Sequence, residues 1–458
     1  MLSKKERVPP IDKPWPDEYF DKHIETMDVE ELKRIQWKKL KNILDYAYHY
    51  CPFYHKRFDE AGVKPDDIKT FKDFVRKIPK FTKDDLRKWT KETGDPYSGI
   101  LGVPEKNLVY VCASTGTTGT PTYYAGDKYG CYELSEAFAR SLWAARLRPW
   151  MKFSHVPLAF HWYVCIYTQA LKLMGMKHIV GLAPWAHPIF AHQILDSLLR
   201  SKPDHMWLTP PPALAVLKAA EEKGIDIPKL VPNLMFMSTG GEAITYGVRK
   251  KFMEGFGLLD FFDTSLSGEG HYTTIECFMH DGCHVWMDKW FVELVDVETG
   301  EPIEEPTESD RGSIVITNLV NRGSIYIRCD TEDAGWIKTE KCACGRTHPR
   351  VEVVDRAIYI VKVSGKKFTP TDVREAIEKI PELSGGDFTI VQYASEMDVL
   401  KIKIAPTIPP KTKEEWDSLE ERTKQVIKRE IGVDAEIRWV KYEELPLIGW
   451  KIARLVKE

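Results

Sequence analysis

The N-terminal part of the chain carries apolar and polar residues in patterns that favour helices. Four prolines (9, 10, 14 and 16) fall within residues 1–25, which predicts an extended arm. From Asp28, apolar residues recur every three or four positions to about residue 48, so we expect a long amphipathic helix there. Cys51-Pro52 ends this helix. Two further short helices are predicted to begin near Lys64-Pro65 and near Phe81-Thr82.

In the middle of the chain the pattern changes between helix and strand. Residues 130–147 are predicted to form a helix because one face collects the apolar side chains of Leu134, Phe138, Leu142 and Ala145. Residues 205–209 form an apolar run, a helical stretch follows Pro210, and residues 234–238 form a second apolar run. This strand–helix–strand order is typical of a parallel sheet, and the fold class is therefore α/β.

The last hundred residues predict a small unit of their own, with a β-β-α-β-β-α-β pattern from Ile358 onward. A turn at residues 364–366 separates the first two strands, and Thr369 opens the first helix. The remaining strands are expected at residues 389–393, 399–405 and 435–440, with a long helix at residues 414–430.

Length, composition and charge limit the classes of protein to which the chain can belong. At 458 residues the chain is too long for one core, and 43% hydrophobic with 29% charged residues is the make-up of a soluble globular protein. The net charge of -3 gives no reason to expect nucleic acid or an acidic membrane as a partner. The first residues lack the apolar core of a signal peptide, and no apolar run reaches the roughly 20 residues of a membrane span, so a cytoplasmic location is expected.

One loop is made almost only of Ser, Thr and Gly. An apolar run, residues 107–112, leads into Ser114, Thr115, Gly116, Thr117, Thr118 and Gly119, and strand character resumes at residues 122–124. Glycines let the backbone approach a ligand while hydroxyls and amides donate hydrogen bonds, an arrangement that suits polyphosphate oxygens. The alternative is a polar hairpin turn. A Walker loop is excluded because its Gly-Lys-Ser/Thr ending is missing.

A second glycine-containing loop follows the apolar run at residues 234–238. It contains Gly240, Gly241 and Glu242, and a helix is expected to begin at Tyr246. Nucleotides bind in open α/β sheets where a strand ends and a helix begins, so this loop is a second candidate for nucleotide binding.

Cysteines and histidines gather in two short clusters, residues 277–284 and 342–348. Nine cysteines in all argue for reduced thiols, some of them metal-bound, rather than a disulfide framework. A turn at Asp281-Gly282 is expected to bring Cys277 and His284 onto facing strands. Four soft ligands fit tetrahedral structural zinc, and the preferred set is Cys277, His284, Cys342 and Cys344, with His280 or Cys283 as substitutes. The alternative is free cysteines on hairpins.

The loop at residues 114–122 resembles the phosphate loop of the AMP-forming adenylating enzymes, which include acyl-CoA ligases, luciferases and peptide-synthetase adenylation domains. Tyr46-Ala-Tyr, Cys51-Pro-Phe-Tyr and Ala61-Gly-Val resemble, more narrowly, the phenylacetate–CoA ligase branch. The similarity runs from about residue 25 to the C-terminus, and some members of this branch carry cysteines and a histidine matching the zinc candidates. It implies a large adenylation domain, residues 1–355, of stacked α/β sheets with a small β-barrel-like part and a helical arm at about 25–95. Residues 356–458 would be a small, mobile, ferredoxin-like lid.

The resemblance also implies roles for individual residues. Glu269 matches the glutamate that holds magnesium, and Asp263 lies in the same nucleotide-binding stretch. Ser265 and Leu266 replace the family's tyrosine and glycine, so Phe261 or Phe262 is a candidate substitute for stacking on adenine. The ribose-binding aspartate, a ribose- or phosphate-binding arginine, the lid turn and the catalytic lysine correspond to Asp333, Arg356, Gly365 and Lys451. Ile358 departs from the family's hinge aspartate or lysine.

The aromatic stretch at residues 151–186 corresponds to the family's acid-binding pocket. Its candidates, together with Gly241, are Phe160, His161, Trp162 and Tyr163, although aromatic residues at this spacing also occur in ordinary cores. The expected function is that of an ATP-dependent carboxylate–CoA ligase acting on an aromatic or arylacetic acid, with ATP, Mg²⁺ and CoA. Adenylation without thioester formation, as in deazaflavin-adenylating synthetases, and a degenerate nucleotide-binding protein are the alternatives. Ligases of this kind are often dimers, which allows for a homodimer.

Overall fold

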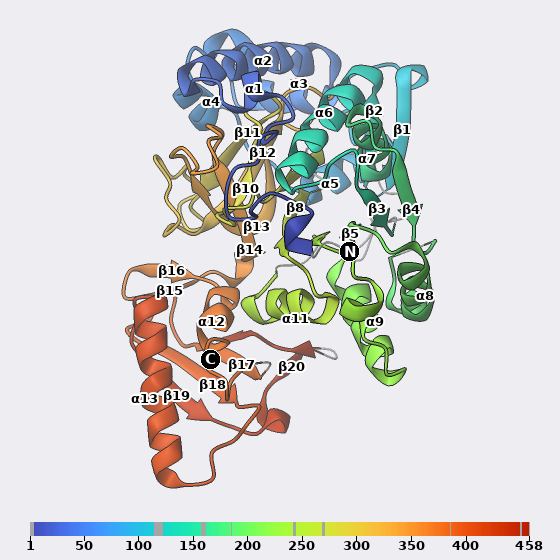
Figure 1. Cartoon of the computed structure of the whole chain (residues 1–458). Coiled ribbons are helices and arrows are strands. Elements are labelled where there is room, and N and C mark those ends of the chain that lie inside the picture. The colour runs from blue at the N-terminus through green and yellow to red at the C-terminus, as the bar shows by residue number, and fades with distance from the viewer. Residues whose placement is uncertain are drawn as a thin grey trace.

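The computed structural model describes residues 4–113, 122–156, 162–184, 186–240, 244–267, 271–384, 386–448 and 451–457 (Figure 1). For residues 162–163, 266–267, 447–448 and 451–452 it describes the backbone. The mixed α/β architecture of several sheets confirms the predicted fold class. Short 3₁₀ turns occur at Lys4–Glu6, Pro65–Asp67, Glu105–Asn107, Pro188–Phe190, Ala357–Tyr359 and Tyr442–Glu444.

The N-terminal helices are α1 (Lys22–Glu25), α2 (Val29–Tyr50), α3 (Pro52–Glu60), α4 (Phe71–Lys77) and α5 (Lys83–Thr93). Of these, α2 and α5 form where the sequence predicts them. The predicted start near Lys64-Pro65 gives only a 3₁₀ turn, with α4 beginning at Phe71, and α1 and α3 were not predicted. The Asp28 side chain caps α2 by accepting hydrogen bonds from the backbone N–H groups of Glu30 and Glu31. Pro52 both ends α2 and occupies the first position of α3, where a missing N–H costs nothing.

The arm before α1 is packed rather than merely extended. Trp15 is 4% exposed, and the carboxylates of Glu18 and Glu25 are buried. Glu18 pairs with Arg146 at 2.6 Å and with Arg346 at 3.0 Å, and Glu25 pairs with Arg346 at 2.8 Å. The arm therefore joins Arg146, just after the helix at Lys128–Ala144, to the loop that contains Arg346.

A five-stranded parallel sheet forms the centre of the large part of the molecule, with strand order β4-β3-β5-β6-β7. Alternate side chains of its strands enter different cores: Trp207, Phe236 and Phe262 pack in one, and Met206, Met237 and Phe261 in the other. Helices cover both faces, as a buried parallel sheet requires (Figure 1). Its elements and the hairpin before it are β1 (Leu108–Ala113), β2 (Tyr123–Asp127), α6 (Lys128–Ala144), β3 (Lys152–His155), α7 (Trp162–Leu173), β4 (His178–Gly181), α8 (Ala191–Ser201), β5 (His205–Trp207), α9 (Pro210–Glu222), α10 (Ile227–Leu230), β6 (Phe236–Ser238), α11 (Tyr246–Phe256) and β7 (Asp260–Phe262).

A hairpin and a five-stranded antiparallel sheet follow. The hairpin pairs β8 (Thr264–Ser267) with β9 (Tyr272–Ile275). The sheet has the order β10-β14-β13-β12-β11 and is formed by β10 (Cys283–His284), β11 (Trp290–Val295), β12 (Gly312–Asn318), β13 (Cys329–Lys338) and β14 (Arg350–Arg356).

The C-terminal part has its own hydrophobic core, built from residues between 361 and 455. Its elements are β15 (Val361–Val363), β16 (Lys366–Phe368), α12 (Pro370–Ile377), β17 (Asp387–Gln392), β18 (Leu400–Ala405), α13 (Lys413–Glu430), β19 (Ala435–Trp439), β20 (Leu447–Ile448), β21 (Lys451–Ile452) and β22 (Leu455–Lys457). The predicted order of strands and helices is confirmed as far as β19. The sequence pattern did not reveal the β20–β21 hairpin or β22, which pairs in parallel with β17.

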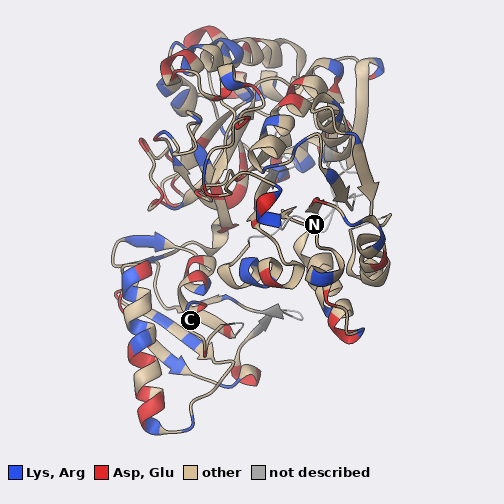
Figure 2. Cartoon of the chain, viewed as in Figure 1, with Lys and Arg blue, Asp and Glu red and all other residues tan. Residues whose placement is uncertain are grey.

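Charged residues of both signs are interspersed along the exposed face of α13 (Figure 2). Among the helices in the described ranges, none combines the length and apolarity that crossing a bilayer requires.

Candidate functional site

The candidate site lies where strands of the parallel sheet end. β6 ends at Ser238, and the buried residues Thr239 and Gly240 follow. The Thr239 hydroxyl donates to the Leu208 carbonyl at 2.7 Å, and its N–H donates to the Phe262 carbonyl at 3.0 Å. These bonds fix the first residues of the second glycine-containing loop (residues 239–245) between the ends of β5 and β7. This loop resembles the family's purine-side loop and is called so below. Gly241 and Glu242 lie outside the described residues.

The predicted phosphate loop connects the two strands of a hairpin. β1 and β2 pair antiparallel, with Ala113 opposite Tyr123, which confirms the strand–loop–strand pattern. The loop candidates themselves, Ser114, Thr115, Gly116, Thr117, Thr118 and Gly119, lie outside the described residues, as does Glu269.

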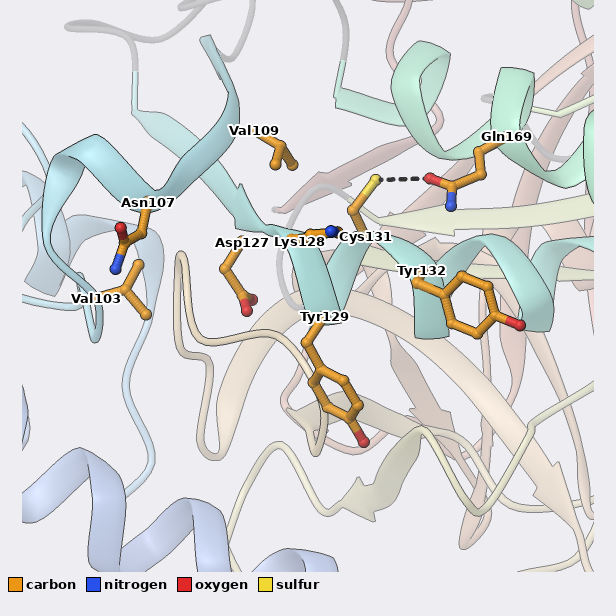
Figure 3. Close-up of a pocket in the computed structure, with 9 residues that line it drawn as sticks. All are labelled: Val103, Asn107, Val109, Asp127, Lys128, Tyr129, Cys131, Tyr132 and Gln169. Carbon is orange, nitrogen blue, oxygen red and sulfur yellow. Dashed lines mark hydrogen bonds between the residues drawn. The ribbon is translucent and has the colours of Figure 1, made fainter.

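A cavity of 680 Å³ opens beside this hairpin, at the N-terminal end of α6 (Figure 3). The Cys131 thiol donates to the Gln169 side-chain oxygen at 3.3 Å across it, joining α6 to α7. No sequence motif pointed to this cavity, and none of the predicted site residues lines it. Its lining residues are Val103, Asn107, Val109, Asp127, Lys128, Tyr129, Cys131, Tyr132 and Gln169.

Asp263 directly follows β7 and faces the purine-side loop. Its carboxylate accepts hydrogen bonds from the backbone N–H of Thr264 at 2.7 Å and from that of Ile244. Its own backbone N–H donates to Glu276, whose carboxylate is held by Arg249 through two contacts of 2.9 Å. Burial, and then the charge of Glu276, raises the pKa of Asp263 to about 8. A protonated Asp263 can both donate and accept a hydrogen bond, which matches the edge of a purine base.

The two phenylalanines proposed to stack on adenine do not face a ligand. Phe261 and Phe262 are both fully buried, and they belong to the two cores on opposite sides of the sheet. Phe261 packs against Phe252 with ring centroids 5.7 Å apart. This expectation was wrong because both faces of β7, the edge strand of the parallel sheet, are covered, and the two rings are taken up by packing in the cores on either side.

Asp333 and Arg356 are brought together by strand pairing. They lie opposite each other on β13 and β14, and the Arg356 guanidinium donates to the Asp333 carboxylate at 2.9 Å. The Arg356 side chain is 51% exposed and that of Asp333 25%, so both can reach a ligand. Glu332 lies 3.7 Å from the same guanidinium and was not foreseen from the sequence.

The chain then passes from the large sheet into the small unit. Ile358, in the 3₁₀ turn Ala357–Tyr359, is 75% exposed. Gly365 forms the turn between β15 and β16 with a φ of +78°, a value that favours glycine. A Cβ on Gly365 would contact nothing within 4 Å, so backbone conformation rather than crowding accounts for the glycine. Lys451 begins β21, directly opposite Ile448 of β20. Its side chain lies outside the description.

The aromatic stretch supplies core residues as well as candidates. Phe153 of β3 and Tyr167 of α7 are buried in the same core, with ring centroids 6.1 Å apart. Burial lowers the pKa of the neighbouring His155 to about 4, so its imidazole is neutral. Phe160 and His161 lie outside the described residues, while Trp162 and Tyr163 begin α7 with side chains outside the description.

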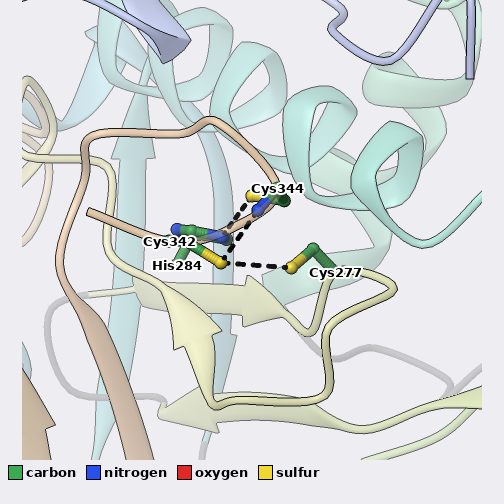
Figure 4. Close-up of side chains that lie close together, drawn as sticks. All are labelled: Cys277, His284, Cys342 and Cys344. Carbon is green, nitrogen blue, oxygen red and sulfur yellow. Dashed lines mark hydrogen bonds between the residues drawn. The ribbon is translucent and has the colours of Figure 1, made fainter. Parts of the chain in front are cut away.

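The four preferred zinc ligands converge. The ligand atoms of Cys277, His284, Cys342 and Cys344 all lie within 4.8 Å of one another, and all four residues are buried (Figure 4). The Cys277 and Cys342 sulfurs are 3.9 Å apart, and the Cys344 sulfur is 3.4 Å from His284 Nε2. Zinc bond lengths in a tetrahedron give edges of about 3.8 Å for two sulfurs and about 3.6 Å for sulfur and nitrogen. The residues present therefore fit this ion.

Surrounding contacts orient these ligands. His284 Nδ1 donates to the His348 carbonyl at 3.2 Å, which leaves Nε2 directed at the three sulfurs. The N–H of Gly345 donates to the Cys342 carbonyl at 2.9 Å, which closes a tight knuckle at residues 342–345. A Cβ on Gly345 would lie 2.2 Å from the Tyr19 hydroxyl. One detail differs from the sequence prediction: Cys277 lies in the turn between Glu276 and Cys283, not on a strand facing His284. The substitutes His280 and Cys283 have other contacts: His280 bonds Asp260 and Glu276, and Cys283 approaches the Asp263 carbonyl.

Comparisons with known proteins agree with this arrangement. Residues 365–458 match the AMP-binding enzyme C-terminal domain family. The solved structure of 2-hydroxyisobutyryl-CoA ligase in an open conformation, in complex with 2-HIB-AMP and CoA, superposes with a TM-score of 0.78 at 20% identity, covering 100% of this chain and 97% of that chain. The likeness confirms the fold.

Among curated proteins, phenylacetate-coenzyme A ligase of Escherichia coli is 27% identical over 442 residues, which cover 94% of this chain and 96% of the relative. The enzyme of the same name from Thermus thermophilus is 30% identical over 399 residues, or 85% of either chain. At that identity and coverage, the chain belongs to the phenylacetate–coenzyme A ligase family of AMP-forming enzymes.

Proposed function

We propose that the protein is an ATP-dependent, AMP-forming carboxylate–CoA ligase that converts an aromatic or arylacetic acid to its CoA thioester through an acyl-adenylate. The observation that carries this proposal is the 30% identity to a phenylacetate-coenzyme A ligase across 85% of both chains. The aromatic candidates Phe160, His161, Trp162 and Tyr163, with Gly241, are proposed to bind the acid. The products are the acyl-CoA, AMP and pyrophosphate.

The first step joins two anions, so the enzyme has to neutralise charge and align the partners. Lys451 is proposed to bind the acid's carboxylate and the α-phosphate oxygens as charge develops. Asp333 accepts hydrogen bonds from the ribose hydroxyls, and Arg356, held beside it at 2.9 Å, reaches the ribose or the α-phosphate. The observed pairing of these two side chains supports a shared role.

The nucleotide's other groups are assigned to the loops. The loop from Ser114 to Gly119 is proposed to bind the leaving pyrophosphate, and Gly240, Gly241 and Glu242 line the base. Asp263 binds the base edge as a neutral acid, consistent with its raised pKa. Glu269 is proposed to hold Mg²⁺, which supplies positive charge to the phosphate oxygens.

The thioester step is assigned to a second arrangement of the two parts of the chain. We propose an adenylation domain of residues 1–355 and a mobile lid of residues 356–458. The separate hydrophobic core of residues 361–455 supports a boundary here. In the second step the Gly365 turn faces the acyl-adenylate and admits the thiol of CoA. A homodimer and a cytoplasmic location are part of the same proposal.

Cys277, His284, Cys342 and Cys344 are proposed to hold a structural zinc ion. All four side chains are buried and all four protein ligands are supplied, so no position is open for a substrate. The ion would tie the knuckle at residues 342–345 to the turn at residues 277–284.

The decisive experiment measures AMP release from ATP and a panel of aromatic and arylacetic acids, with and without CoA. A ligase forms the acyl-CoA and releases AMP in equal amounts when CoA is present. If an acyl-adenylate forms and never passes to CoA, the ligase assignment is wrong and adenylation without thioester formation replaces it. If no acid or CoA stimulates AMP release although ATP binds, the protein is a nucleotide-binding protein instead.

A further inference from the structure

The small C-terminal part contacts the large part through one face of α12. The Glu375 carboxylate accepts hydrogen bonds from the backbone N–H of Tyr246, with oxygens 2.9 and 3.1 Å away. One turn further on, Glu378 accepts from the N–H of Gly247 at 3.0 Å. α11 and α12 accordingly lie side by side (Figure 1).

These two acceptors complete the start of α11. The first N–H groups of a helix have no partner within it and carry partial positive charge. Thr245 caps α11 by accepting from the N–H of Val248, which leaves the N–H groups of Tyr246 and Gly247 for other acceptors. The carboxylates of Glu375 and Glu378 fill this need from across the junction between the two parts.

A third acid on the same face makes an ion pair across the junction. Asp372 accepts two hydrogen bonds from the Arg311 guanidinium, at 2.6 and 3.2 Å. Asp372, Glu375 and Glu378 are spaced three residues apart, so they lie along one side of α12. Nearby, Lys367 pairs with Asp296 and, at 3.3 Å, with Glu298 of the large part.

We propose that Asp372, Glu375 and Glu378 are positioning residues that dock the lid on the N-terminal end of α11 and on Arg311, and thereby hold one of the two lid orientations. α11 begins just after the purine-side loop. The helix on which the lid docks therefore also holds one end of that loop. Releasing this contact changes adenylate formation and thioester formation by different factors. The expected difference between adenylate formation and thioester formation rests on the proposed function, whereas the docking proposal does not.

The docking test is limited proteolysis of the full-length chain, without substrates. Trypsin cleavage after Arg356 needs the hinge to open, and the fragment of residues 357–458 reports it by mass spectrometry. In the Glu375→Ala/Glu378→Ala variant we expect cleavage roughly 5- to 30-fold faster, the range that one or two lost contacts of this strength produce. The Glu375→Gln/Glu378→Gln variant keeps acceptor oxygens. Its cleavage rate is expected to lie between that of the alanine variant and that of the parent protein.

A second variant approaches the contact from the other side. In Gly247→Ala the added Cβ lies 2.9 Å from Glu378 Oε2 and displaces that carboxylate, while alanine favours helix α11 itself. Cleavage is again expected to accelerate, with an unchanged Tm. The control is Arg422→Ala, which removes the 2.6 Å ion pair with Glu382 inside the small part and leaves the junction untouched.

The outcomes separate the two proposals. If the double alanine variant and Gly247→Ala are both cleaved at the parental rate, the docking proposal is overturned. Pyrophosphate exchange and transfer from preformed acyl-adenylate to CoA are then compared in the same variants. Equal changes in both steps refute the role in partitioning. Absence of both steps in the parent protein instead refutes the proposed function, and the proteolysis result stands.

Discussion

At the scale of single residues, the opposed positions of Asp333 and Arg356 give a sharp test of nucleotide binding. The Asp333→Ala variant loses an acceptor for the ribose hydroxyls and is expected to raise KM for ATP about 5- to 100-fold, the range for one or two hydrogen bonds to a charged group. Steady-state kinetics of AMP formation measure this. The matched control is Glu332→Ala, which neighbours the same guanidinium at 3.7 Å and is half exposed. Equal effects of the two substitutions would contradict a specific role for Asp333.

The C-terminal lysine carries a separate prediction. Removing one group that stabilises transition-state charge costs about 10²- to 10³-fold in rate, so Lys451→Ala should lower pyrophosphate exchange by that factor. ATP affinity, measured by isothermal titration calorimetry, should change little. Lys457→Ala, at the exposed end of β22, serves as the control. A Lys451→Ala protein that exchanges pyrophosphate at the parental rate would remove the central assumption of the proposed mechanism.

Single residues also show where sequence reasoning succeeds and fails. Asp333 and Arg356 were found from motifs 23 positions apart, and strand pairing joins them. The prediction for Phe261 and Phe262 was wrong because the local sequence around an aromatic residue is the same whether its side chain faces a ligand or a core. Glu276 and Arg249, which set the charge around Asp263, were missed since no local pattern distinguishes them from solvated residues.

At the scale of elements, the knuckle at residues 342–345 and the turn at residues 277–284 form the proposed zinc site. Purified protein should contain about one zinc per chain by elemental analysis. The Cys344→Ser variant should lose the ion and unfold roughly 5–15 °C lower, because a structural ion stabilises only the folded chain.

The control for this prediction is Cys283→Ser. Cys283 is buried within the same turn, but its sulfur approaches the Asp263 carbonyl instead of the cluster. We expect it to retain full zinc content. Chelator-washed parent protein that contains no zinc and has an unchanged Tm would exclude the site.

Element-level prediction worked best where local signals were strong. The Asp28 cap, Pro52 and the apolar periodicity placed α2 to within two residues at either end. The β20–β21 hairpin and β22 lack such signals, since each is two or three residues long and forms only by pairing with neighbours.

At the scale of the whole molecule, the junction between α11 and α12 predicts a dependence on pH. Burial, opposed by the Tyr246 N–H and assisted by Glu378, raises the pKa of Glu375 from its ordinary value of 4.5 to about 7. The charged neighbours of Glu375 are Glu378 and Lys379 just after α12, Arg249 on α11 and Glu352 on β14. In the docked orientation Glu375 thus keeps its proton up to about pH 7, whereas in the undocked orientation it loses the proton near its ordinary pKa of 4.5. Docking is therefore strongest at low pH and weakens as the pH rises through about 7.

Small-angle X-ray scattering tests this dependence. The radius of gyration of the parent protein is expected to increase between pH 5.5 and pH 8, and that of Glu375→Gln, which does not titrate, to stay constant (pH values chosen to lie about 1.5 units below and 1 unit above the raised pKa). An equal increase in both proteins would assign the change to other groups.

The N-terminal arm has a consequence for how the chain is made. Glu18 and Glu25 are translated well before their partner Arg346, which follows 328 and 321 residues later. At translation rates of about 5–20 residues per second, this is a delay of roughly 16–66 seconds. Glu18 can meet its other partner, Arg146, after 128 residues, whereas Glu25 stays in water until Arg346 has emerged. A nascent chain that stalls before Arg346 therefore leaves Glu25 without its ion-pair partner, and the part of the arm around it is more open to proteases.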